Sequence, residues 1–314
     1  MNENRGRRPI VVGYDGSPQA HDALALGAAI AAATGDPLVL AGAYGPQEVV
    51  RDEALDLRRA EVLEQLGHAA DSLPSDATFQ VERRAVAGSS AAAALHELAE
   101  VEHPRALVLG SCHRGAVGRV LIGGVAERLL HGSPCPVAVA PRGLADRGPV
   151  ELETLCVGFD GGAEGWTALQ RAAQIAAGAG ARVRVALALP PLVGTPAMPV
   201  LPAEIVEQRL KDAEIALYHA VNSVSRRVEP EGRLLRGDPA QLLADESAQG
   251  VDLLVVGSRG YGPLRRVLLG SVSTALMHSA TCPVMVVPRT AEFDPSGEGL
   301  AGEDEVVPSG RARD

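Results

Sequence analysis

The sequence predicts an α/β protein of two tandem domains, each with a doubly wound parallel five-stranded sheet. Three observations lead to this fold class. The chain has 314 residues, a length that suits two domains. Several sequence motifs occur twice in the same order. Within each half, short apolar runs alternate with longer segments of helical periodicity, and parallel strands need such helical crossovers.

The repeat is visible in four pairs of segments. Equivalent positions are 145 residues apart in the first pair (15 to 160) and 147 apart from the second pair onward (110 to 257), so small insertions lie between them. This pattern indicates a tandem duplication. The pairs are Ile10–Ser17 with Leu155–Gly162, Ala106–Ser111 with Leu253–Ser258, Leu129–His131 with Leu276–His278, and Cys135–Arg142 with Cys282–Arg289.

The second half shows the order of elements most clearly. Leu155–Phe159 is a short β-rich run that ends before Asp160 and two glycines, which predicts a strand. Ala163–Ala179 places its apolar residues on one broad face and predicts a helix. Arg182–Leu189 predicts the second strand, and the prolines up to Pro202 predict a loop.

The later elements of this half follow from the same patterns. Ala203–Arg227 has apolar residues at helical spacing, and the first half repeats the whole order. The remaining predicted elements are a strand near Arg233–Leu235, a turn at Gly237-Asp238-Pro239, a helix over Ala240–Ala248, a buried strand Leu253–Val256, a helix from Gly270 and a strand Val284–Val287.

The repeat divides the chain into residues 8–143, residues 152–290 and a tail at 291–314. The tail is acidic and lacks periodicity, so it is predicted to be disordered. The last strands of the two halves, Val137–Ala140 and Val284–Val287, are apolar and predicted to lie at sheet edges, which invite pairing. We expect them to pack the two halves as a pseudo-two-fold pair; a further homodimer is also compatible with the sequence.

Composition disfavours several classes of function. The chain has 29 basic and 39 acidic residues, and this charge of −10 opposes binding to nucleic acid or anionic membrane surfaces. Its four cysteines form no CxxC motif, which argues against a zinc knuckle or a disulfide framework. The prolines within its longest uncharged stretch, from Val185 to Pro202, argue against a membrane helix. The expected location is the cytoplasm.

A glycine-rich segment after the fourth strand of the second half has the features of a phosphate cradle. Gly257 and Gly260 would let backbone amides approach a ligand and adopt positive φ, and Arg259 could supply positive charge. The helix beginning near Gly270 would offer free N–H groups and its positive dipole end. Ser271, Ser273 and Thr274 would add hydroxyl groups.

The spacing Gly-x2-Gly-x9-Gly-Ser, after an Asp at the end of the first strand and before Cys-Pro-Val, resembles the universal stress protein family in its tandem two-domain form. The resemblance covers residues 9–289. It implies a Rossmann-like sheet of the adenine nucleotide alpha hydrolase type. It also implies adenine-nucleotide binding in some members and none in others, with ATP as the expected ligand and often a divalent ion such as Mg²⁺.

Carried over residue by residue, the family pattern matches the second half well. The resemblance assigns Asp160 to the nucleoside and Ala188 to the wall around adenine. The phosphate positions would be Gly257, Arg259, Gly260, Gly270, Ser271, Val272 and Ser273.

The first half departs from the pattern and keeps only Asp15, Gly110 and Gly123. The departures are Cys112 at the position of Arg259, His113 at Gly260, Gly124 at Ser271 and Ala126 at Ser273. We therefore expect the first half to bind nucleotide weakly or not at all. The contrary hypothesis is that His113 and Arg114 supply charge and keep an altered site.

Structural explanations compete with these functional ones. The glycines could serve a tight turn alone, and Asp15 and Asp160 could simply cap helices. Cys112-His113 lacks a visible orienting group for an activated thiol. The remaining candidates have ordinary interpretations: helix-end imidazoles at His131 and His278, small buried residues at Cys135 and Cys282, and a chance GxGxxG match from Gly297 to Gly302.

The sequence thus predicts an ATP-binding regulatory or stress-response protein whose nucleotide site lies mainly in the second half. Nucleotide would order the Gly257–Ser271 loop and thereby change the affinity of a surface for an unidentified protein partner. The alternative is a stress scaffold or protein-interaction module that binds no nucleotide. No placed general base is visible, so at most slow ATP hydrolysis is expected.

Overall fold

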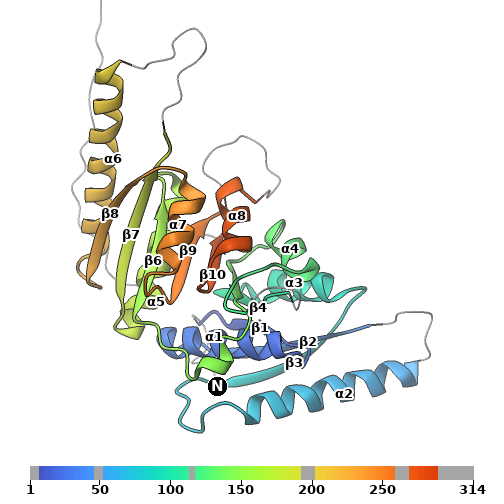
Figure 1. Ribbon diagram of the computed structural model, residues 1–314. Coiled ribbons are helices and arrows are strands. Elements are labelled where there is room, and N and C mark those ends of the chain that lie inside the picture. The colour runs from blue at the N-terminus through green and yellow to red at the C-terminus, as the bar shows by residue number, and fades with distance from the viewer. Residues whose placement is uncertain (1–6, 46–51, 113–116, 192–201, 259–268, 289–314) are drawn as a thin grey trace, which may run out of the picture.

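The computed structural model describes residues 7–45, 52–112, 117–191, 202–258 and 269–288 (Figure 1). Its strands form one ten-stranded sheet in the order β3-β2-β1-β4-β5-β10-β9-β6-β7-β8. The first half contains β1 (Ile10–Gly13), α1 (Pro18–Thr34), β2 (Leu38–Tyr44), α2 (Asp52–Asp71), β3 (Val81–Ala87), α3 (Ala91–Glu102), β4 (Ala106–Gly110), α4 (Gly124–Leu130) and β5 (Val137–Ala140). The second half contains β6 (Thr154–Phe159), α5 (Ala163–Ala179), β7 (Arg182–Leu189), α6 (Ala203–Val224), β8 (Pro230–Arg236), α7 (Pro239–Ser247), β9 (Leu253–Gly257), α8 (Ser271–Ser279) and β10 (Val284–Val287).

The two halves have the same topology and meet through their last strands. Within each half all strand pairs are parallel, and the second strand lies between the first and the third. β5 and β10 pair antiparallel, with Ala138 opposite Met285. This arrangement confirms the predicted fold class, including the pseudo-two-fold pairing of the halves.

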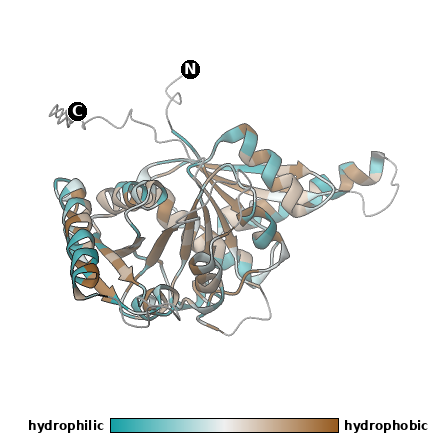
Figure 2. Cartoon of the chain, turned by 90° about the horizontal axis from the view of Figure 1, so that it is seen from above, coloured by the Kyte–Doolittle hydropathy of each residue, from teal (hydrophilic) through white to brown (hydrophobic). Residues whose placement is uncertain are grey.

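Helices cover both faces of the sheet. One face carries α1, α2, α5 and α6, and the other carries α3, α4, α7 and α8. The central strands are buried on both sides, so they are continuous apolar runs; Ile10, Val11 and Val12 are all fully buried. Figure 2 shows this distribution, with apolar colours along the central strands and hydrophilic patches on the helices.

Local signals explain where several helices begin and end. α1 begins after Ser17, whose side chain accepts a hydrogen bond from the Ala20 amide, and it ends at Gly35 with φ of 67°. Asp238 caps α7 in the same way, so that helix begins at Pro239 rather than at the predicted Ala240. The Asp22 carboxylate accepts hydrogen bonds of 2.8 Å from the amides of Gly143 and Ala145, which ties the connection between the halves to α1.

Other predicted bounds differ modestly from the structure. The predicted helix Ala203–Arg227 ends at Val224, and the predicted strand near Arg233–Leu235 extends over Pro230–Arg236 because it pairs with β7 from Val183 to Leu189. The predicted tail at 291–314 lies outside the described residues. Within the part of the chain that the structure describes, no helix is both long enough and apolar enough to span a membrane.

Candidate functional site

A cavity of about 480 Å³ lies at the carboxyl ends of β6, β7 and β9, where the strand order of the second half reverses. α6, α7 and the start of α8 complete its walls. Arg259 and Gly260 lie outside the described residues. Thr274 does not line the cavity, and all other residues predicted for this half do, namely Asp160, Ala188, Gly257, Gly270, Ser271, Val272 and Ser273.

Asp160 owes its position to a tight turn between β6 and α5. Gly161 has φ of 79°, and the Gly162 amide donates a 2.9 Å hydrogen bond to Oδ1 of Asp160. The N-cap of α5 is Gly162, so the interpretation of Asp160 as the helix cap is wrong. The first half has the same turn, in which the Ser17 amide donates a 3.0 Å bond to Asp15 and Ser17 is the cap. The turn thus fixes an exposed carboxylate at the mouth of each cavity.

Small apolar side chains line the wall beside Asp160. Ala186 and Ala188 come from β7, and Leu243 comes from α7. These residues place apolar surface in the same cavity as a carboxylate, which suits a flat ring joined to a hydroxyl-bearing group. The sequence prediction found Ala188 and missed the others.

α6 contributes charged lining residues that the sequence prediction also missed. Arg209 and Asp212 lie on the cavity wall, and Gln208 donates a 2.7 Å hydrogen bond to the Asp212 carboxylate. Helical periodicity assigned these residues to a helix. It gave no signal that this part of the helix borders the cavity.

The start of α8 also lines the cavity. Its N-cap is Gly270, which provides no side-chain hydrogen bond to the first turn, and that turn carries no acidic residue. Ser273 is buried and donates a 2.8 Å hydrogen bond to the Gly257 carbonyl, so its hydroxyl holds α8 against the end of β9. Ser271 is exposed at the cavity. The start of α8 can receive an anion through the N–H groups and positive dipole end of the helix.

Gly257 has a structural reason to be glycine. A Cβ atom there would lie 2.9 Å from Cβ of Glu164 in the first turn of α5. The φ angle of Gly257 is not positive, so the expectation of a positive φ at this position is wrong. At Gly110, a Cβ atom would collide with the backbone carbonyl of Gln19. Both glycines therefore allow a helix to approach the end of a strand closely, whether or not a ligand binds.

The first half has its own cavity, of about 650 Å³, at the equivalent edge of the sheet. Asp15, Gly110 and Gly123 all line it, together with Cys112. α4 begins after Gly123 and has Glu127 in its first turn. His113 and Arg114, on which the contrary hypothesis depends, lie outside the described residues.

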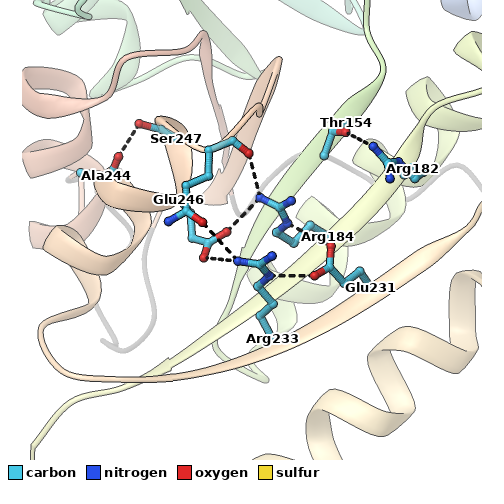
Figure 3. Close-up of polar contacts among 9 residues, drawn as sticks. Thr154, Arg182, Arg184, Glu231, Arg233, Ala244, Glu246 and Ser247 are labelled. Atoms are coloured by element: carbon cyan, nitrogen blue, oxygen red, sulfur yellow. Dashed lines mark hydrogen bonds and ion pairs between the residues drawn. The ribbon is translucent and has the colours of Figure 1, made fainter.

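A second polar cluster lies away from the cavity, on β7, β8 and α7 (Figure 3). Glu246 is buried and accepts hydrogen bonds from Arg184 at 3.0 Å and from Arg233 at 3.1 Å. Glu231 bonds to the same two arginines, at 3.2 Å and 2.8 Å, and these bonds lower the pKa of its carboxyl. Because every charge has a partner, the cluster is a structural network rather than a reactive site.

The cysteines and acidic residues offer little for catalysis in the described part of the chain. Burial raises the pKa of the Cys135 thiol to about 11 and that of the Cys156 thiol to about 12, and it also raises the pKa of Cys282. These thiols are poor nucleophiles. Cys112 is half-buried. No group of three metal-ligating side chains is found among the described residues.

Comparison with known proteins identifies the family. The model of the Universal stress protein family matches residues 6–141 and 151–288. Universal stress protein Rv2005c of Mycobacterium tuberculosis is 30% identical over 299 residues, which cover 91% of this chain and 99% of that protein. A universal stress protein structure from Archaeoglobus fulgidus shares the fold, with a TM-score of 0.65, 18% identity and coverage of 90% and 99%. This chain belongs to the universal stress protein family, with the family domain present in both halves.

Proposed function

We propose that the protein binds an adenine nucleotide, with ATP as the expected ligand, in the cavity of its second half. One observation carries the proposal: a carboxylate, small apolar residues and a helix N-terminus without a side-chain cap all line one cavity. The cavity volume of about 480 Å³ is in the range of small-molecule sites.

Each part of the cavity suits one part of the nucleotide. The Asp160 carboxylate would accept hydrogen bonds from the ribose hydroxyls, and adenine would lie against Ala186 and Ala188. The phosphates would lie at the start of α8, near Ser271. Arg259 and Gly260 are expected to complete the phosphate site by their family positions.

In this proposal the protein is a nucleotide-responsive regulator of the stress response in the cytoplasm. Its output would be a partner-binding surface whose affinity depends on nucleotide occupancy. Linkage then requires that partner binding change the affinity for nucleotide by the same factor as nucleotide changes the affinity for the partner. The competing function is a scaffold that binds no nucleotide.

Calorimetric titration of the whole chain with Mg–ATP tests the proposal. We expect about one site per chain with micromolar affinity, a free energy of about −8 kcal/mol. Asp160→Ala should weaken this binding strongly, whereas the matched variant Asp15→Ala should not change it. Gly260→His, which copies the first half, should also abolish it. Absence of binding heat with nucleotide-free protein would favour the scaffold.

A further inference from the structure

The end of the cavity proposed to hold base and ribose is nearly the same in both halves. Asp15 and Asp160 close the same turn, and each lines its own cavity. The sheet registers place β2 and β7 equivalently: Ala41 pairs with Gly13, and Ala186 pairs with Gly158. The equivalent lining residues are Gly13 and Gly158, Tyr14 and Phe159, Asp15 and Asp160, Ala41 and Ala186, and Ala43 and Ala188.

The start of α4 at the first-half cavity differs from the start of α8 in its side chains. Gly124 and Ala126 line the cavity where the second half has Ser271 and Ser273. Glu127 lies in the first turn of α4, at the position of Thr274 in α8. Its negative charge offsets the positive end of the helix dipole and would weaken the attraction for a phosphate.

The remaining described lining of the first-half cavity mixes apolar and uncharged polar residues. Asp15 is the one charged residue among the described residues that line it. α2 contributes Gln65, whose side-chain amide donates a 3.1 Å hydrogen bond to the Asp15 carbonyl. In the second half, α6 instead contributes Arg209 and Asp212.

From this combination we infer that the first-half cavity binds a nucleoside, a base and sugar without phosphate. The inference rests on the proposed function, because it uses the same roles for the Asp and Ala residues. Asp15 accepts hydrogen bonds from the sugar hydroxyls, and the base lies against Ala41 and Ala43. With Glu127 in the first turn of α4 and Gly124 in place of Ser271, an added phosphate weakens binding.

Cys112 provides a reporter for this cavity alone. It lines the first-half cavity and is half-buried. The other three cysteines are buried, and burial raises the pKa of each thiol. A thiol reagent should therefore react first at Cys112, and a ligand in the cavity should slow that reaction.

The test is the rate at which N-ethylmaleimide modifies Cys112 in the whole chain, measured by mass spectrometry. Adenosine should slow the reaction by the factor 1 + [L]/Kd, about tenfold at ten times Kd. Mg–ATP at the same concentration should slow it far less. Equal protection by Mg–ATP, or none by adenosine up to its solubility limit, would overturn the inference.

Two matched variants assign the protection to the correct half. Asp15→Ala should remove protection by adenosine, and Asp160→Ala should leave it intact. Cys112→Ser should abolish the fast reaction, which checks that the other thiols do not contribute. Mg–ATP calorimetry on the same protein separates the two ideas: loss of ATP binding with retained adenosine protection would contradict only the proposed function of the second half.

Discussion

The two halves of the chain share a sheet order, helix positions and the Asp-Gly turn after the first strand, yet they differ in two local regions. One is the start of the helix after the fourth strand, where Glu127 in α4 corresponds to Thr274 in α8. The other is the second strand, where Val39 corresponds to Arg184. The duplicated framework has therefore kept its backbone geometry while the chemistry of both regions changed.

The second region shows two ways of filling the same space. Arg184 joins the buried network around Glu246, whereas Val39 is buried in an apolar cluster. The outer ion pair is present in both halves, as Glu82 with Arg84 at 2.9 Å and Glu231 with Arg233 at 2.8 Å. A buried ion network contributes to stability only while all its charges are paired, and an apolar cluster has no such requirement.

The largest expected effect comes from breaking the network. Glu246→Ala leaves Arg184 with fewer partners in a mostly buried position, and we expect the free energy of unfolding to fall by about 3 kcal/mol. The double variant Arg184→Val with Glu246→Leu imitates the first half and should lose less than about 1 kcal/mol. Urea denaturation measures both. A double variant as unstable as the single one would show that the halves are not interchangeable here.

A smaller effect should distinguish the two glycines at the ends of β4 and β9. Gly110→Ala directs a methyl group at the backbone carbonyl of Gln19, and we expect a loss of about 2 kcal/mol. Gly257→Ala directs its methyl group at Cβ of Glu164, 2.9 Å away, with the Glu164 backbone slightly farther, and should cost about 1 kcal/mol. Thermal unfolding of the two variants checks the order. The reverse order would mean that the approach of α5 to β9 is less tolerant than that of α1 to β4.

The smallest effect concerns the charge at the start of α8. Thr274→Glu places a carboxylate in the first turn, as Glu127 does in α4, and should weaken Mg–ATP binding about fivefold, or about 1 kcal/mol. Thr274→Gln is the uncharged control and should bind almost normally. Calorimetry at low and high salt provides the measurement. An effect that does not shrink with added salt would not be electrostatic.

Much of the fold could be predicted because its signals are local. The helix Ala163–Ala179 and the strand Arg182–Leu189 have the bounds that their patterns predict. The predicted end of α6 at Arg227 lies three residues beyond its observed end at Val224, because no glycine or proline among residues 225–227 marks the end of the helix. The pairing of β5 with β10 followed from two apolar strands at predicted sheet edges.

The candidate site could be predicted only where the sequence repeats a motif. Asp160 directly follows β6 and Gly257 is the last residue of β9, so the sequence could place both at the carboxyl ends of strands. Arg209 reaches the cavity from a long helix, and the contact of Arg184 with Glu246 joins residues far apart in sequence. Such contacts depend on tertiary packing, which a single sequence does not encode in its periodicity.

The antiparallel pairing of β5 with β10 has a consequence for how the protein responds to dilution. Because both strands belong to one chain, their association is intramolecular, and its effective concentration does not depend on how much protein is present. Two domains on separate chains would dissociate at low protein concentration, and each could also pair with a second copy of itself. Here each molecule always presents one cavity of each kind, at a fixed ratio of one to one.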